Sequence, residues 1–330
     1  MRYLTVLGCA LLLMPCAATL VFAEQPTLTE WDVPYPDSRP RDPYVDVNGI
    51  VWFVGQRNDY VASFDPKTEA FRRLPLDDGT GPHNLIVAGG DTIWYAGNRA
   101  THIGRMSVKD GTIHKIMMPD AAARDPHTLV FDTAGDIWFT VQGGNFVGKL
   151  TIADESVRLL PIASGRSRPY GINIAPDGVV WATLFGTNKL VRIDPTTFEV
   201  TEVELPRAGA RPRRLEITSD GSIWYVDYAE GYLGRLDPQT GTISEWLAPS
   251  GADSRPYGME VDTNDRLWFV ESGPRPNQFV GFDTTSETFI AGVALASGGG
   301  TVRHMHYDKP TNSVWFGTDT NTIGRAQLPD

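Results

Sequence analysis

Arginine, histidine and tyrosine side chains recur at one position along the chain, directly after a proline in six places and after Val302 in a seventh. Guanidinium groups bind carboxylates and phosphates through charge-assisted hydrogen bonds. We therefore predict a site for a carboxylate, a phosphate or a polar carbonyl group. The alternatives are pairing of these arginines with acids of neighbouring loops, and ordinary Arg-Pro turn chemistry. The seven segments are Arg39-Pro40-Arg41, Gly81-Pro82-His83, Asp125-Pro126-His127, Arg168-Pro169-Tyr170, Arg211-Pro212-Arg213, Arg255-Pro256-Tyr257 and Thr301-Val302-Arg303-His304.

Four histidines are candidates for proton transfer. His83 and His127 hold the same position in successive segments, while His304 and His306 alternate and would point to one side of a strand. A histidine beside a carboxylate such as Asp125 can act as a general base near neutral pH. The alternative for each histidine is a hydrogen-bonded structural role.

Three acids follow tryptophans closely and are candidate metal ligands. Asp227 and Glu271 each come three residues after a tryptophan, and Asp319 comes four residues after Trp315. Adjacent acids in loops can hold a divalent cation whose shell is completed by water. The alternative is that they are ordinary surface acids.

The elements that position these residues form a tandem repeat of short strands. The tryptophans are spaced by 42, 44, 43, 43, 44 and 47 residues, and strands bounded by Gly, Asn, Asp and Pro surround each one. This pattern is typical of β-propeller blades, in which one large aromatic residue per blade fills the gap between adjacent sheets. We predict an all-β fold, a seven-bladed propeller with four-stranded blades. The tryptophans are Trp52, Trp94, Trp138, Trp181, Trp224, Trp268 and Trp315.

The blade topology predicts where the candidate residues meet. The loop into the innermost strand and the loop between the second and third strands open on the same side, so both groups of candidates surround one mouth of the channel. The seventh copy stops after its third strand, whereas residues 30–34 repeat the pattern of residues 245–249. We expect the N-terminal strand to complete the last blade and close the ring.

Residues 1–23 have the composition of a secretory signal, with an apolar run from Val6 to Leu20 and the small-residue site Val21-Phe22-Ala23. We expect residues 24–330 to form a single periplasmic or secreted domain without a membrane span. A membrane anchor is the alternative. Both cysteines lie in the first 23 residues, so we expect no thiol chemistry in the remainder.

The charge of the expected mature chain is strongly negative. Loss of Arg2 changes the formal net charge from −11 to −12. An acidic surface disfavours nucleic acid as a partner, which leaves a small ester or anionic molecule as the expected ligand. Because ring closure leaves no obvious strand edge for pairing, we expect a monomer.

Several motifs resemble the streptogramin B lyase family across essentially the whole mature chain. They include Pro169-Tyr170-Gly171-Ile172 with Pro176-Asp177-Gly178, and Leu233-Gly234-Arg235-Leu236-Asp237-Pro238. The resemblance implies a carbon–oxygen lyase that opens a cyclic depsipeptide or lactone by elimination across its ester. It also implies that Mg²⁺ polarises the carbonyl, that a histidine removes the α-proton, and that no organic cofactor is needed.

The family pattern places an acid two residues before the catalytic histidine and a glutamate about fourteen residues after it. A second histidine lies one blade earlier. In the third copy, Asp125 and His127 match, with His83 one blade earlier, but Val141 stands in place of the glutamate.

Two other copies match the family pattern in part. In the sixth, Glu271 matches the glutamate, while Tyr257 replaces the histidine and Arg255 the first acid. In the last copy His304 takes the place of the histidine if no gap is allowed, and Asp319 lies beside the position of the glutamate.

Two functions follow from these residues. The first is a metal-assisted lyase with His304, His127 or Tyr257 at the base position and Glu271, Asp227 and Asp319 as metal ligands. The second is a non-catalytic binding or sensor propeller whose mouth captures an anion or a partner's peptide. The predicted ligand-binding residues are His83, Arg41, Tyr170, Arg213, Arg255, Arg303 and Tyr228.

Overall fold

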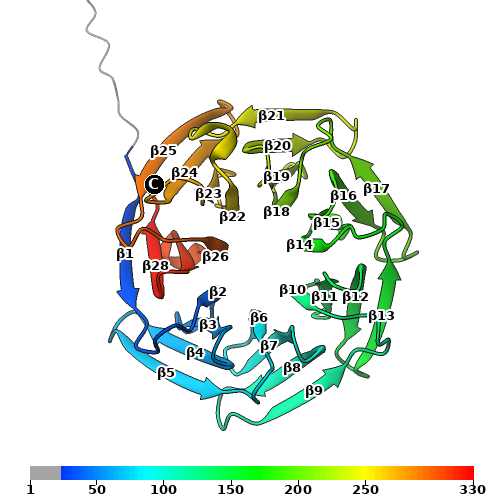
Figure 1. Ribbon diagram of the computed structural model, residues 1–330, viewed down its shortest axis with the longest axis vertical. Coiled ribbons are helices and arrows are strands. Elements are labelled where there is room, and N and C mark those ends of the chain that lie inside the picture. Colours follow the sequence, from blue (N-terminus) through cyan, green and yellow to red (C-terminus); the bar gives the residue numbers. More distant parts are fainter. Residues whose placement is uncertain (1–23) are drawn as a thin grey trace, which may run out of the picture.

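The computed structural model describes residues 24–330, and the predicted signal segment lies outside the described residues. Seven four-stranded antiparallel sheets stand in a ring around a central channel (Figure 1). The prediction of a seven-bladed β-propeller is therefore confirmed. Within residues 24–330 no helix is long and apolar enough to cross a membrane.

Each blade begins with its inner strand at the channel. The first four, written from the channel outward, are β2 (Pro40–Val45), β3 (Val51–Gly55), β4 (Tyr60–Asp65) and β5 (Ala70–Pro75); β6 (Pro82–Ala88), β7 (Thr92–Gly97), β8 (His102–Ser107) and β9 (Ile113–Met117); β10 (Pro126–Phe131), β11 (Ile137–Val141), β12 (Phe146–Thr151) and β13 (Ser156–Pro161); and β14 (Pro169–Ile174), β15 (Val180–Leu184), β16 (Lys189–Ile193) and β17 (Val200–Glu204).

The remaining three blades follow the same order. They are β18 (Pro212–Ile217), β19 (Ile223–Asp227), β20 (Tyr232–Leu236) and β21 (Ile243–Leu247); β22 (Pro256–Val261), β23 (Leu267–Glu271), β24 (Gln278–Asp283) and β25 (Thr288–Ala294); and β26 (Val302–Asp308), β27 (Ser313–Thr318), β28 (Thr322–Gln327) and β1 (Thr27–Asp32). Two short 3₁₀ turns lie between strands: Gly251–Asp253 between β21 and β22, and Lys309–Thr311 between β26 and β27.

The seven tryptophans of the repeat fill the seams between blades. Each is at most 3% exposed. Trp138 packs with Ile172 and Val180 of the next blade, and Trp181 packs in the same way with Leu215 of the blade that follows it. Because each indole contacts two sheets, it couples the packing of one blade to that of its neighbour.

In three blades, an aspartate six residues before the tryptophan fixes the turn that leads to it. Asp46 accepts hydrogen bonds from the amides of Asn48 and Ile50 and from Nε1 of Trp52. Asp262 makes the same contact with Trp268 at 2.9 Å. One carboxylate thus holds both the hairpin turn and the indole in place.

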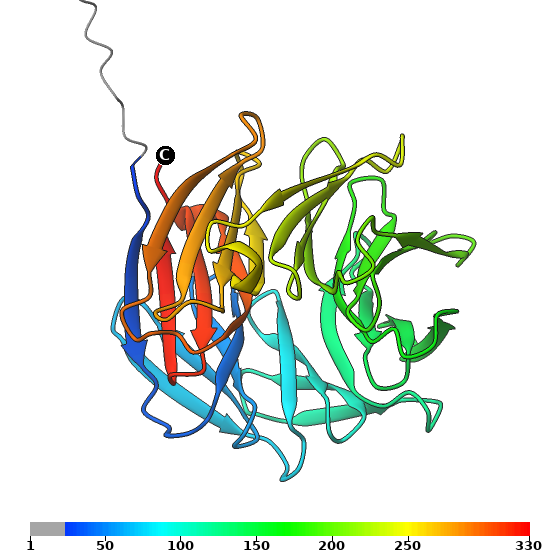
Figure 2. The same cartoon turned by 45° about the horizontal axis from the view of Figure 1, so that its top comes forward.

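The N-terminal strand closes the ring, as predicted. β1 pairs with β28 from Thr27 opposite Gln327 to Asp32 opposite Thr322, and Trp31 stacks on Trp315 at 5.6 Å. Figure 2 shows β1 beside the C-terminal strand. The last blade therefore consists of strands from both ends of the described chain.

A β-bulge near the start of every inner strand shapes the channel wall. In β14, Pro169 pairs with Leu184, but Ile172 pairs with Ala182, so the register shifts between them. A bulge places an extra residue on one strand and turns the strand locally. The second and third residues of each inner strand, here Tyr170 and Gly171, therefore both lie at the bulge.

Replacing Gly234 by alanine tests the close packing of the third strand against the ring of Tyr225. A Cβ at Gly234 would overlap that ring, and overpacking a core costs about 1–3 kcal/mol. We expect Gly234→Ala to lower the free energy of unfolding by this amount in urea denaturation. Gly292→Ala, whose Cβ would meet no atom within 4 Å, is the control. Equal stability of the two variants would contradict the packing argument.

Candidate functional site

The second residues of the seven inner strands form a ring at one end of the channel. We call it the mouth ring. It contains two imidazoles, two phenols and three guanidinium groups, one from each blade. Its members are Arg41, His83, His127, Tyr170, Arg213, Tyr257 and Arg303.

Four aromatic side chains form a continuous row along the mouth ring. The ring centroids of His83 and His127 are 3.5 Å apart, and those of His127 and Tyr170 are 3.9 Å apart. The hydroxyl groups of Tyr170 and Tyr257 form a hydrogen bond with each other. Because these side chains come from successive or nearby blades, the row lines a large part of the mouth.

Both histidines of the mouth ring are neutral at neutral pH. Burial, reinforced by the nearby charge of Arg41, holds the pKa of His83 well below its usual value. Burial and Arg214 lower the pKa of His127 in the same way. These imidazoles are therefore available as hydrogen-bonding groups rather than as cations.

Arg213 is held by aromatic rings. Its guanidinium carbon lies 4.0 Å from the ring centroid of Tyr257 and 4.2 Å from those of Phe185 and Tyr228. Burial would lower its pKa, but Tyr257, Tyr170 and Tyr228 outweigh that effect and raise it. Within residues 24–330 no acidic side chain forms an ion pair with Arg213, so no carboxylate of the described chain compensates its charge.

A second polar layer lies directly below the mouth ring and centres on Asp42, which is fully buried. Its carboxylate accepts hydrogen bonds from Nε of Arg41 at 2.9 Å and from the amide of Asn84 at 3.2 Å, and Arg214 approaches to 3.5 Å. Burial alone would raise the pKa of Asp42, but Arg41 and its other cationic neighbours outweigh it and lower the pKa. Asp42 is therefore ionised and fixes the orientation of Arg41.

Arg214 ties the second layer to the blades on the opposite side of the channel. It donates to the hydroxyl of Thr128 at 3.0 Å and to the carbonyl oxygen of Arg303 at 2.9 Å. The residue is 3% exposed. The polar interior of the channel is thus a connected network rather than a set of separate pairs.

Several buried polar atoms of the mouth have no hydrogen-bond partner in the part of the chain that the structure describes. They are Nη2 of Arg41, Nδ1 of His83 and Nε of Arg213. Nδ1 of His83 lies 3.8 Å from Asp42, which is too long for a hydrogen bond, and the imidazole is neutral. Buried polar groups are normally paired, so these atoms are the candidate contacts for a bound polar group.

The three predicted metal ligands are each engaged by their own neighbours. Glu271, 1% exposed, accepts hydrogen bonds from the amide and hydroxyl of Ser250. Asp227, fully buried, is bound by Arg207 at 3.1 Å, and Asp319 is paired with Arg303.

The structure does not bring Glu271, Asp227 and Asp319 together as one ligand set. Within residues 24–330, no group of three His, Cys, Asp or Glu side chains is placed to hold a metal ion. The donors present at the mouth, mainly guanidinium groups and neutral imidazoles, do not fit Mg²⁺, which prefers carboxylate and water oxygens.

The ungapped alignment of the last copy is wrong by one residue. Val302 pairs with Thr318 and lies thirteen residues before Trp315, whereas Pro256 lies twelve residues before Trp268. The extra residue is accommodated at the 3₁₀ turn after β26. Arg303 therefore takes the place in the mouth ring, and His304 lies in the second layer, where burial and then Arg214 lower its pKa to about 3.

The other predicted ligand-binding residues have different environments. Tyr228 packs on Arg213 beside Tyr257. Arg303 pairs with Asp319, so for this residue the alternative of pairing with a loop acid is correct. Arg255 is exposed, outside the buried ring.

Sequence reasoning missed the second layer, which includes Asp42, Asn84, Thr128 and Arg214. A regular strand would send alternate residues to opposite faces, so the position next to the mouth ring is expected to point away from the channel. The bulge breaks this alternation. The available signal is the run of polar residues in that column of the repeat.

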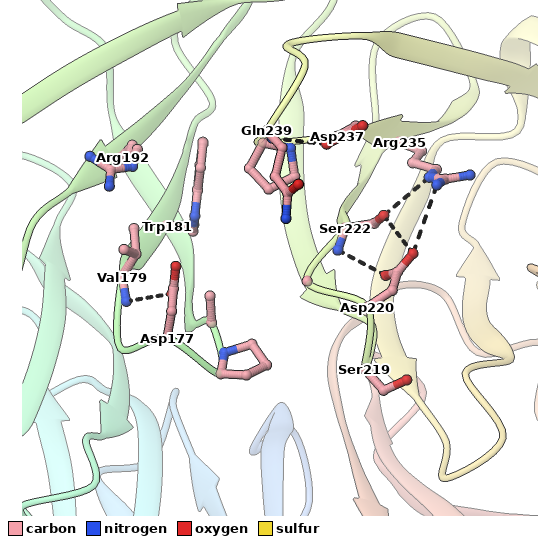
Figure 3. Close-up of a pocket in the computed structure, with 14 residues that line it drawn as sticks. Asp177, Val179, Trp181, Arg192, Ser219, Asp220, Ser222, Arg235, Asp237 and Gln239 are labelled. Carbon is pink, nitrogen blue, oxygen red and sulfur yellow. Dashed lines mark hydrogen bonds and ion pairs between the residues drawn. The ribbon is translucent and has the colours of Figure 1, made fainter.

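A groove of about 440 Å³ between the fourth and fifth blades lies away from the mouth (Figure 3). Its acids are satisfied locally, since Asp177 accepts from the amide of Val179 and Asp220 accepts from Ser222. Arg235 lies 3.8 Å from Asp220. The groove is therefore a gap between the turns of two blades, and both of these acids already have hydrogen-bond partners in it.

Comparisons with known proteins agree with this architecture. The family model described as the virginiamycin B lyase family matches residues 21–184 and 155–329. A solved streptogramin B lyase is 28% identical, with a TM-score of 0.83, and the alignment covers 92% of this chain and 98% of that protein. A comparison with curated protein sequences gave no match.

Two structures of virginiamycin B lyase from Staphylococcus aureus are similar in fold. The enzyme itself and a catalytically inactive variant solved with quinupristin are each 23% identical, with a TM-score of 0.83, over 92% of this chain and 100% of theirs. The two family-model matches overlap and together span all seven blades. This chain belongs to the virginiamycin B lyase family.

Proposed function

We propose that the protein binds a small molecule bearing a carboxylate at the mouth ring. The observation that carries this proposal is the set of buried donors without partners on Arg41 and Arg213, beside the neutral His83. A carboxylate supplies two oxygens with several acceptor positions, which matches guanidinium donors held at fixed positions. The expected exported location would expose this mouth to solutes of the periplasm or medium.

The second layer supports the proposal because it prepares Arg41 for a ligand. Asp42 engages Nε of Arg41, and the amide oxygen of Gln56 accepts from Nη1 at 3.1 Å. Nη2 is left free of partners within the described chain. A guanidinium group fixed before binding loses little conformational freedom when the ligand arrives.

The family supports elimination across an ester as a second candidate function. The specific observation is the hydroxyl pair of Tyr170 and Tyr257 beside Arg213. Burial would raise the pKa of Tyr170, but Arg213, Arg41 and Arg214 outweigh it and lower the pKa. Tyr170 is therefore the proposed base of the mouth ring.

The proposed elimination needs no step through a metal ion. With Tyr170 ionised, its phenolate oxygen takes the proton from the carbon α to a carbonyl. The electron pair then forms the carbon–carbon double bond, and the bond between the β-carbon and the ester oxygen breaks, so that this oxygen leaves with its electron pair as a carboxylate. Arg41 and Arg213 stabilise the negative charge that develops on the carbonyl oxygen. A carboxylate product would then remain as a ligand for the same guanidinium groups.

Arg213→Ala tests carboxylate binding. We expect wild-type protein to bind members of a panel of aliphatic mono- and dicarboxylates more tightly than their amides in calorimetry. Arg213→Ala removes a hydrogen bond to a charged group, so this variant should bind the same carboxylates about tenfold to hundredfold more weakly than the wild type. The exposed Arg168→Ala serves as the control and should retain wild-type affinity. Equal binding of carboxylates and amides would overturn the proposal.

Tyr170→Phe tests the second candidate, with quinupristin as the probe substrate and ring opening followed by mass spectrometry. If Tyr170 is the base, the variant should lose about 100-fold or more in rate. Activity of the wild type should persist in EDTA. Abolition of activity by EDTA, or full activity of Tyr170→Phe, would contradict the metal-free elimination.

A further inference from the structure

A second ring of side chains surrounds the channel at the end away from the mouth. Each member is the inner-strand residue that pairs with the tryptophan of its blade, and we call this set the far ring. All seven line one cavity of about 260 Å³. They are Tyr44, Ile86, Val130, Asn173, Glu216, Glu260 and His306.

The cavity has an apolar side and an acidic side. Ile86 and Val130, from the second and third blades, face the cavity together with Phe131. Glu216 and Glu260 come from the adjacent inner strands β18 and β22. A ligand that fits this arrangement has a short apolar body and a polar head with hydrogen-bond donors.

The two carboxyl groups lack a cationic partner. Glu216, 8% exposed, accepts a hydrogen bond from the amide of Asn173 at 2.8 Å. Neither Glu216 nor Glu260 forms an ion pair with any residue in the range 24–330. Burial of like charges without counterions is unfavourable, so a cation in this cavity would remove a cost that the ligand-free protein carries.

The ionisation of the pair reflects this environment. Burial raises the pKa of Glu216 to about 8. Burial, and then Glu216, raise the pKa of Glu260. Arg214, in the layer above, opposes both shifts without reversing them. The ligand-free pair therefore retains a proton at neutral pH.

An independent observation points into the same cavity. The side chain of His304 lines this cavity, and its Nδ1 atom is buried without a hydrogen-bond partner among residues 24–330. His304 is neutral because burial, and then Arg214, hold its pKa at about 3. His306, also neutral because burial lowers its pKa to about 4, stacks on Tyr44 at 4.3 Å.

We propose that the far ring binds a small primary amine, as its ammonium ion, through Glu216, Glu260 and His304, with the apolar tail against Ile86 and Val130. A primary ammonium has three N–H donors. The cavity presents three acceptors, namely two carboxylates and one neutral imidazole nitrogen. No part of this proposal depends on the ligand of the mouth ring.

The carboxyl pair gives the proposal a specific pH signature. An ammonium ion favours the ionised form of both carboxyl groups, so binding at neutral pH should release a proton from the pair. Affinity should then rise with pH between 6 and 8, by up to about tenfold per pH unit, because fewer protons must be displaced. The aliphatic amine itself stays protonated throughout this range.

The test is calorimetry with hexylammonium as the probe, using the full mature chain. Hexylammonium should bind, whereas hexanoate and hexanol should not. Glu216→Gln and Glu260→Gln should each weaken binding at least tenfold, and the exposed Glu199→Gln should leave it unchanged. Because glutamine has the size of a protonated glutamate and carries no charge, the variants should keep the wild-type melting temperature, which verifies that they are folded.

A second measurement addresses proton release. Titrations at pH 7 in phosphate and in Tris, which differ in ionisation enthalpy, should show release of protons on binding by the wild type and less release by the glutamine variants. Arg213→Ala should bind hexylammonium as the wild type does, which separates this site from the mouth. The proposal is overturned if hexylammonium does not bind at millimolar concentration, if hexanol binds equally well, or if both glutamine variants bind normally.

Discussion

A single buried carboxylate, that of Asp42, organises the polar interior of the channel. It neutralises part of the charge of Arg41 and Arg214, and through them it links the first blade to the third, fifth and seventh. The three guanidinium groups of Arg41, Arg213 and Arg214 outnumber this one carboxylate, whereas Arg303 is paired with Asp319. The remaining positive charge and the unpaired donors of the mouth both follow from that imbalance.

The channel is polarised along its length. Cationic and aromatic groups surround the mouth, whereas Glu216 and Glu260 lie in the far ring with apolar residues opposite them. Arg214, in the layer between, influences the pKa values of groups at both ends, including His127 and Glu216. One scaffold thus offers two chemically opposite environments, and family membership alone assigns a function to neither of them.

The tryptophan spacing was sufficient to predict the blades, because each indole must fill the same seam. The residues of the mouth ring were also predictable, since a proline begins six of the seven inner strands. Asp42 and Arg214 were not, because a bulge cancels the two-residue alternation of the strand. The position of His304 was wrong by one residue because the last hairpin is longer. The role of Glu260 could not be predicted from the sequence, because it depends on Glu216, which lies on the adjacent inner strand.

Whether the mouth ring receives a carboxylate can be seen in a crystal structure of the protein soaked with a carboxylate that binds in calorimetry. We expect carboxylate oxygens within hydrogen-bond distance of Nη2 of Arg41, with His83 or Arg213 as a further donor. Density for the ligand only at exposed arginines such as Arg168 or Arg255, with the mouth ring unchanged, would contradict it.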